Sequence, residues 1–320
     1  MPTPLNTLQN ANAADHLRVR RTITAEFSPR RLAQWTQCAP EFVDNLIASL
    51  SGGEVDLVTE FAVPLPAAIL GQLLGLGDSE RETLLGWANS TLVPADGEAP
   101  RARDTLATMR AIIEATIDHA RSGPTDTVLA RLVAGYDESS AQQRDELVAL
   151  LFYMLFVWYE VLVDLISGAV LALLCHPEEL RVFRADAQRQ LAAVDELLRY
   201  LSPQVLAGPR FATVDVQIGD HTIRAGQTVL FCLASANHDP DHYDDPERLD
   251  LAKPRSPHTA LGYGIHACLG TALVRTVAAT TLDRLFTRWP DTMLAVPEDE
   301  IRWRSGFRHR GPHALRLVLA

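Results

Sequence analysis

The 320-residue chain has little of what secreted, disulfide-bonded or nucleic-acid-binding proteins require. Only four cysteines are present, and their wide scatter predicts reduced thiols rather than a disulfide framework. The first residues show no basic segment followed by an apolar one, so we expect no signal peptide and a cytoplasmic location. Positive charge is scarce, with 29 Lys and Arg against 40 Asp and Glu. The resulting net charge of -11 argues against a nucleic-acid partner.

Internal repeats and low-complexity segments are also absent, and the hydrophobic content of 47% is ordinary for a globular protein. Most of the chain has a helical pattern. It changes to alternation only over 210–235, where Gly-Asp and Ala-Gly turns separate β-rich runs. We therefore predict a mainly α protein with a small antiparallel β-sheet. It should form a single domain over 1–320, of which 1–13 are a disordered lead-in.

One apolar run, 146–175, is long enough to cross a membrane. Glu160 and Asp164 lie within it, four residues apart and therefore on one helix face. Because a charge at the centre of a bilayer is costly, we expect no membrane span. The run predicts a helix buried on nearly all sides, passing through the middle of the protein.

The stretch from His258 to Gly270, HTALGYGIHACLG, places several glycines around one thiol, Cys268, directly before a helical pattern. Glycine allows positive φ and lets the backbone approach a flat ligand. Free N–H groups at a helix start favour a thiolate. These features suit an axial haem ligand whose sulfur accepts amide N–H bonds. From the residues alone, three other interpretations stay open: a buried structural cysteine, a metal site with His266, or a Cys/His nucleophile pair.

The segment LGYGIHACLG resembles the haem-binding loop of the cytochrome P450 family. Leu261 stands where the family has the phenylalanine that packs beside the proximal thiolate, which implies altered tuning of the iron rather than lost ligation. The resemblance covers about residues 13–320. It implies a cytochrome P450-like fold, haem b (iron protoporphyrin IX) as cofactor, and Cys268 as the ligand of the haem iron. The loop residues that it assigns to the cofactor are Leu261, Gly262, Gly264, His266, Cys268 and Gly270.

Upstream of the loop, Glu196 and Arg199 have the family's E-x-x-R spacing. Arg248, in DDPERLD, matches the third member of the same buried ion-pair network. The resemblance gives this network a structural role, holding the haem-loop region in shape. As an isolated pattern, E-x-x-R is equally typical of an exposed helix pair.

A second match lies near the start of the chain, where His16 and Arg20 have the family's H-x-x-x-R spacing on a helix. The resemblance implies that both face the haem propionates, together with Arg210 and His266. Basic groups around two carboxylates form charge-assisted pairs. A solvated basic face is the alternative for the first pair.

The match begins at this helix, so we expect a truncated P450 without the family's N-terminal helices and strands. The strands predicted within 208–235 would then lack their usual partner, and an open strand edge invites association. We predict that a second copy of the chain, as a homodimer, or another covering protein lies over this face.

The long helix departs from the family's oxygen-activating signature, A-G-x-E/D-T. Aligned through ISGAVLALLCHPE, the acid remains as Glu160, whereas Val161 replaces the alcohol that helps to deliver protons. Trp158 replaces the glycine that leaves room above the iron, and its indole either caps the distal side or turns away. The loss of a proton relay predicts slow or uncoupled hydroxylation.

The resemblance also implies a mainly apolar, modest-sized organic substrate. The chain has no flavin or iron–sulfur motif, so chemistry with dioxygen would need a separate ferredoxin and reductase. We predict a monooxygenase-like oxidoreductase of specialised metabolism that performs an atypical oxidation. Two alternatives are a non-oxidative catalyst (cyclisation, dehydration or rearrangement) and a non-catalytic partner of a full-length relative. The predicted substrate contacts are Val157, Gln204, Val205, Leu206, Ala207 and Phe307.

Overall fold

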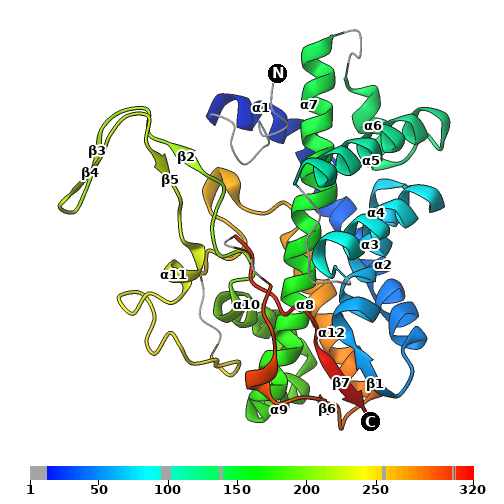
Figure 1. Cartoon of the computed structure of the whole chain (residues 1–320), viewed down its shortest axis with the longest axis vertical. Coiled ribbons are helices and arrows are strands. Elements are labelled where there is room, and N and C mark those ends of the chain that lie inside the picture. The colour runs from blue at the N-terminus through cyan, green and yellow to red at the C-terminus, as the bar shows by residue number, and fades with distance from the viewer. Residues whose placement is uncertain (1–12, 95–101, 137–139, 254–256, 305, 307) are drawn as a thin grey trace.

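The computed structural model describes residues 13–94, 102–136, 140–253, 257–304, 306 and 308–320. The predicted lead-in, apart from residue 13, and the predicted substrate contact Phe307 lie outside the described residues. Helices dominate the rest, as Figure 1 shows, and the predicted mainly α class is confirmed. The α-helices are α1 (Ala13–Thr24), α2 (Pro29–Ser49), α3 (Pro64–Leu74), α4 (Asp78–Leu92), α5 (Ala102–Ser122), α6 (Val128–Ala134), α7 (Ala141–Phe152), α8 (Trp158–Cys175), α9 (Pro177–Ala185), α10 (Gln190–Leu201), α11 (Leu233–Asn237) and α12 (Thr271–Arg288).

The strands and the short helical turns are brief. The strands are β1 (Gly53–Asp56), β2 (Arg210–Phe211), β3 (Val216–Ile218), β4 (His221–Ile223), β5 (Thr228–Val229), β6 (Met293–Leu294) and β7 (Arg316–Leu319). The π-helical turns are η1 (Val58–Ala62) and η2 (Tyr153–Val157), and the 3-10 turns are η3 (Ala187–Arg189), η4 (Gly264–His266) and η5 (Glu298–Glu300).

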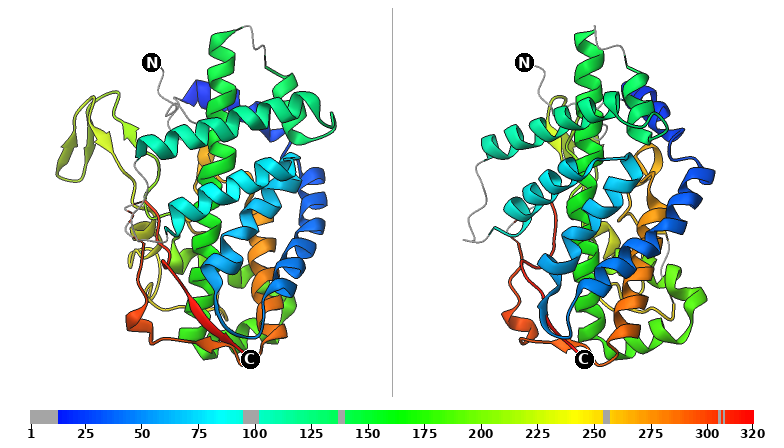
Figure 2. Two further views of the ribbon diagram at one scale, coloured as in Figure 1. Left: turned by 45° about the vertical axis from the view of Figure 1, so that its right-hand side comes forward. Right: turned by 90° about the vertical axis from the view of Figure 1, so that its right-hand side faces the viewer.

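A continuous helix made of α7, η2 and α8 runs through the middle of the molecule (Figures 1 and 2). Every residue from Leu162 to Leu173 in α8 is buried. Tyr159 is also buried, and its hydroxyl donates to the carbonyl of Val63 at 2.5 Å. The helix is long and apolar enough to cross a membrane, but 61% of its most apolar window is covered by the rest of the protein. The prediction of a buried central helix is confirmed.

The remaining long helices pack around this axis. α12 contacts α2, α8 and α10, while α3 contacts both α2 and α8. Side chains on all of these helices join one apolar core. Because α12 is held by three neighbours, the loop directly before it, which carries Cys268, has a fixed position against the body of the protein.

The strands form three small antiparallel groups. β7 lies between β1 and β6, and the β1 register pairs Gly53 with Leu319. Over 210–235 the predicted sheet is two separate ladders, β2–β5 and β3–β4. The β3–β4 hairpin extends away from the helical body in Figure 1. In the β2–β5 ladder, Phe211 and Thr228 are exposed and their neighbours Arg210 and Val229 are only partly buried.

Candidate functional site

The loop that carries Cys268 folds back on itself just before α12. The backbone N–H of Cys268 donates to the carbonyl of Leu261 at 2.8 Å, which closes the loop. Gly262 and Gly264 have φ values of +75° and +60°, which favour glycine. A Cβ atom at residue 262 would also lie 2.6 Å from the backbone oxygen of His266. The tight turn therefore requires glycine at 262 both for its φ and for the close approach of the chain.

The thiol of Cys268 is held by groups that favour its ionised form. The backbone N–H of Gly270 and the side chain of Thr271 bond to the sulfur, and Arg20 adds positive charge, all of which lower the pKa of Cys268. Burial acts in the opposite direction and is the largest effect, so the pKa lies above its ordinary value. The helix start therefore favours the thiolate as expected, but burial outweighs it. A coordinating metal ion deprotonates a thiol outright, so iron would supply the missing positive charge.

Four basic side chains from three parts of the chain converge beside this loop. The rings of His16 and His266 lie 4.3 Å apart, and Arg210 and Arg20 act on both electrostatically. Burial, followed by Arg210, His16 and Arg20, lowers the pKa of His266 to about 4. Burial, Arg20 and Arg210 also lower the pKa of His16. An anion placed among these groups would relieve their mutual repulsion.

His16 tests directly whether an anionic group fits here. The residue is only 2% exposed, and its Nδ1 atom is buried without a hydrogen-bond partner among the described residues. An unpartnered buried polar atom is costly unless a ligand satisfies it. Arg20 differs from expectation, because its guanidinium donates to the carbonyls of Ile265 and Ala267 at 2.7 and 2.5 Å. Arg20 thus fastens α1 to the Cys268 loop, and the basic cluster as a whole fits a carboxylate-bearing cofactor.

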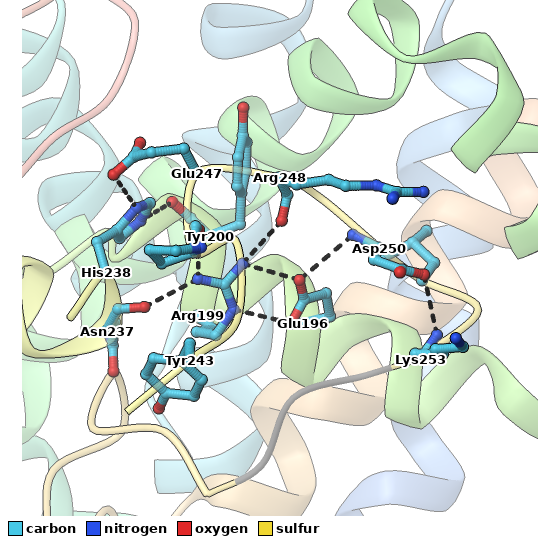
Figure 3. A network of polar contacts seen from close by, with 12 residues as sticks. Glu196, Arg199, Tyr200, Asn237, His238, Tyr243, Glu247, Arg248, Asp250 and Lys253 are labelled. Carbon is cyan, nitrogen blue, oxygen red and sulfur yellow. Dashed lines mark hydrogen bonds and ion pairs between the residues drawn. The ribbon is translucent and has the colours of Figure 1, made fainter. Parts of the chain in front are cut away.

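Figure 3 shows a buried polar network centred on Arg199. Arg199 and Glu196 are both fully buried and form two hydrogen bonds, of 2.9 and 2.8 Å. The same guanidinium donates to the carbonyls of Asn237, Pro246 and Arg248. Arg248 is exposed, and it contributes to the network through its backbone oxygen, which accepts a hydrogen bond from Arg199. The prediction that Arg248 is a buried member of the network is therefore corrected.

This network reaches the Cys268 loop through two residues. The side-chain oxygen of Asn237 accepts hydrogen bonds from the backbone N–H and the hydroxyl of Thr259, at 2.7 and 2.9 Å. The carbonyl of Thr259 then accepts from the N–H of Gly262 at 2.8 Å. Since Arg199 binds the carbonyl of Asn237, α10 is linked by consecutive contacts to the loop that holds the thiol.

The residues that the resemblance places on the haem face opposite Cys268 lie where the central helix changes from π to α geometry. Val157 ends η2 and Trp158 begins α8; both are partly buried, and Trp158 packs against the core. Val161 is partly buried as well. Glu160 extends toward the C-terminal segment, where its carboxylate lies 3.6 Å from Nε2 of His309. π-helical turns are frequent at functional sites, which agrees with a special role for this part of the helix.

The predicted substrate contacts 204–207 form a strand-like segment between two others. On one side, the N–H of Val205 donates to the carbonyl of Arg308 at 2.8 Å, and residue 204 bridges His309. On the other, Leu206 bridges Cys232, and the N–H of Ala207 donates to Phe231 at 2.9 Å. All four residues, Gln204 included, are partly buried. The structure thus brings 204–207 close to Glu160 through the C-terminal segment.

Sequence reasoning missed the residues of that segment. Arg304 pairs with the buried carboxylate of Asp164, and His309 faces Glu160. The signal was present for Asp164, because an acid within a helix predicted to be buried requires a positive partner. What the sequence could not show was which of the many downstream basic residues supply them.

The sequence of the chain matches that of known proteins over most of its length. A model described as cytochrome P450 matches residues 191–289. Cytochrome P450 107B1 of Saccharopolyspora erythraea is 34% identical over 304 residues, which cover 94% of this chain and 74% of the relative. The chain belongs to the cytochrome P450 family. The family's cofactor is haem b, in agreement with the thiol loop and the basic cluster described above.

Other P450s align with almost the whole length of the chain, in sequence or in structure. Vitamin D(3) 25-hydroxylase of Pseudonocardia autotrophica is 34% identical over 97% of this chain and 76% of its own. The tirandamycin C-bound structure of the P450 monooxygenase TamI aligns with a TM-score of 0.86 at 32% identity, covering 97% of this chain and 76% of TamI. The structure of PksS from Bacillus subtilis 168 aligns with a TM-score of 0.87 at 28% identity, covering all of this chain and 84% of PksS. The predicted P450 fold is confirmed.

Proposed function

We propose that this P450 is a haem-thiolate oxidoreductase in which Cys268 ligates the haem iron. His16, Arg210 and His266 hold the propionates, while Arg20 fixes the loop beside them. The observation that carries this proposal is the convergence of a partly buried thiol and an unpartnered buried histidine on one site. When bound, the haem supplies the oxidative chemistry. The chain's own groups orient the cofactor, neutralise its carboxylates and donate hydrogen bonds to the ligating sulfur.

We infer that the oxidation is atypical, because the residue after the acid of the distal helix carries no hydroxyl, and the hydroxyl of Tyr159 before it is bonded to the carbonyl of Val63. Val161 offers only methyl groups next to Glu160, so it can neither hold nor pass a proton. Glu160 instead faces His309. Trp158 adds bulk to the same helix turn, where it packs against the core.

Replacing Val161 by threonine should restore coupling between electron supply and product formation. The change replaces one methyl group by a hydroxyl beside Glu160, and a positioned acid–base group typically contributes about 100-fold or more. With a surrogate ferredoxin and reductase, we expect less peroxide released per NADPH consumed than in the wild type. Val163→Thr, at a buried position in the same helix, is the matched control. Unchanged peroxide release in Val161→Thr would contradict the proposal.

We propose a mainly apolar, modest-sized substrate from specialised metabolism, bound between α8 and residues 204–207. The relatives support this class: one is named for polyketide biosynthesis and another as nocardicin C N-oxygenase. Electrons would come from a ferredoxin and its reductase in the cytoplasm. Two arginines of α1 and α2 are already paired within the chain: Arg18 with Glu146 at 2.7 Å, and Arg31 with Glu26.

We also propose that a second copy of the chain covers the β2–β5 region. Phe211 and Phe231 are 61% and 53% exposed, and Val214 and Ile218 are similarly uncovered. Exposed apolar side chains beside open strand edges favour association, and a two-fold dimer pairs such a surface with itself.

Light scattering at micromolar concentration should show a dimer of the wild-type protein. Joint replacement of Phe211 and Phe231 by serine should produce monomers, because it removes two large apolar contacts from the proposed interface. Met293→Ser is the control, since Met293 is comparably exposed but lies in β6, in a different sheet. A wild-type monomer would contradict the proposed interface.

A further inference from the structure

The described residues of 302–313 form a hairpin near the C-terminus, called the C-terminal hairpin below. Its two arms pair with each other, because the N–H of Arg304 donates to the carbonyl of Gly311 at 3.0 Å. The second arm also pairs with the segment 203–207, into which the N–H of Arg310 donates at 3.0 Å. The hairpin therefore supports the predicted substrate contacts of that segment, which face α8 across the proposed pocket.

One buried ion pair attaches this hairpin to the central helix. Asp164 lies on α8 with its side chain fully buried, and it pairs with Arg304, whose side chain is only 11% exposed. Burial lowers the pKa of Arg304, as expected of a cation removed from water. A buried guanidinium and a buried carboxylate each need the other, since an unpaired buried charge is strongly destabilising. The pair therefore fixes the first arm of the hairpin against α8.

The hairpin approaches α8 too closely for any side chain at residue 311. A Cβ atom on Gly311 would overlap the carboxylate of Asp164 and would lie 3.0 Å from the guanidinium of Arg304. The φ of Gly311 is not positive, so space rather than backbone conformation is the reason for glycine. Charge at residues 164 and 304 and the lack of a side chain at 311 thus define one point of contact.

A second carboxylate lies close to the same guanidinium. Glu160, one helix turn before Asp164, stabilises the charge of Arg304. Possible ligand atoms of Glu160, Asp164 and His309 lie within 4.8 Å of one another, but a metal ion there would have to displace the buried guanidinium. Glu160 is therefore the alternative partner of Arg304. If Asp164 lost its charge, Arg304 would be drawn toward Glu160, and the hairpin would shift along α8.

We propose that the Asp164–Arg304 pair positions the pocket wall formed by the C-terminal hairpin and 203–207, and so determines which apolar groups the pocket accepts. This inference rests on the proposed function. Both are positioning residues, which act through the hairpin without touching the substrate. When the pair is broken, the wall is displaced from α8. A ligand group that packs on the wall then loses affinity, whereas binding at the iron is retained.

The first test compares two probes, imidazole and 4-phenylimidazole, in titrations of the haem-loaded protein followed by its haem absorption band. Both bind iron through a ring nitrogen, and only the second has an apolar ring that packs on the pocket walls. Asp164→Asn removes the charge, whereas Gly311→Ala keeps both charges and separates them. In each variant we expect 4-phenylimidazole to bind about 10-fold more weakly, because burial of its phenyl ring is lost. Imidazole affinity should not change.

Two controls match these changes. Asp118→Asn breaks an aspartate–arginine pair on α5 whose side chains are largely exposed. Gly52→Ala adds a Cβ atom that meets nothing closer than 3.8 Å. Both controls should keep the wild-type ratio of the two affinities, as would a contact that only adds stability. A wild-type ratio in both Asp164→Asn and Gly311→Ala would overturn the proposal, as would a haem-loaded wild type for which the phenyl ring adds no affinity.

The second test needs neither a probe nor turnover. Backbone amide exchange, measured by mass spectrometry, should be faster at Arg304 and Arg310 in Asp164→Asn than in the wild type, because these amides bond within the hairpin and to 203–207. The amides that pair β1 with β7 should stay protected, since that sheet does not depend on the ion pair. Unchanged exchange at Arg304 and Arg310 would show that the hairpin keeps its place without the pair, and would contradict the proposal.

The carbon monoxide spectrum of the reduced protein separates the two levels of inference. Without a thiolate-type band in the wild type, the proposed function fails. A normal band in the wild type and in both variants, together with wild-type azole affinities and amide exchange, refutes the positioning role of Asp164 and Arg304 alone.

Discussion

Cys268→Ser abolishes the thiolate-type absorption shift that we expect of the reduced protein under carbon monoxide. Serine has nearly the shape of cysteine, and the backbone bond from residue 268 to Leu261 does not involve the side chain. The loop should therefore keep its fold while it loses the ligand atom. A hydroxyl is far less acidic than a thiol and is a harder donor, so it does not replace thiolate on haem iron.

The measurement is the ratio of haem to protein together with the spectrum of the reduced protein under carbon monoxide. Cys232→Ser is the matched control, because Cys232 is a free, exposed cysteine outside the Cys268 loop. We expect the control to keep both haem content and spectrum. A thiolate-type band that persists in Cys268→Ser would show that another residue ligates the iron.

Arg199→Ala should lower the free energy of unfolding by about 3–5 kcal/mol, because it leaves the fully buried carboxylate of Glu196 without its partner. Three backbone carbonyls, of Asn237, Pro246 and Arg248, would also lose their donor. Because Asn237 holds Thr259 in turn, the damage should reach the Cys268 loop, and haem content should fall with stability.

Denaturant unfolding of the purified protein gives the free-energy difference. The matched control is Arg110→Ala, which breaks an arginine–glutamate pair that is 72% and 44% exposed. Exposed pairs of this kind contribute about 0–1 kcal/mol. If Arg199→Ala costs no more than Arg110→Ala, the network does not hold the loop region.

Local patterns predicted the mainly α class, whereas the cytochrome P450-like arrangement followed from the resemblance to that family. The central helix was predictable because two acids on one face of an apolar run argue against a membrane span and leave a buried helix as the simplest structure. The glycines around Cys268 indicated a tight turn, and the φ of +75° at Gly262 shows why glycine is needed there. The strands over 210–235 were less predictable, since alternation indicates strands but not which of them pair. Two short ladders formed in place of one sheet.

The electrostatics of the site could not be predicted from spacing. The helix start was expected to favour the thiolate, but burial has the larger effect on the pKa of Cys268. Arg248 matched a motif by position, yet its backbone carbonyl rather than a buried side chain meets Arg199. The contact between Glu160 and His309 joins residues 149 positions apart in the numbering, and only the folded chain reveals it.

The measurement that tests this account most directly is the absorption spectrum of the purified wild-type protein, first oxidised and then reduced under carbon monoxide. We predict bound haem and the long-wavelength band of a thiolate-ligated iron. Haem that binds carbon monoxide without that band, or protein that takes up no haem, would contradict ligation by Cys268.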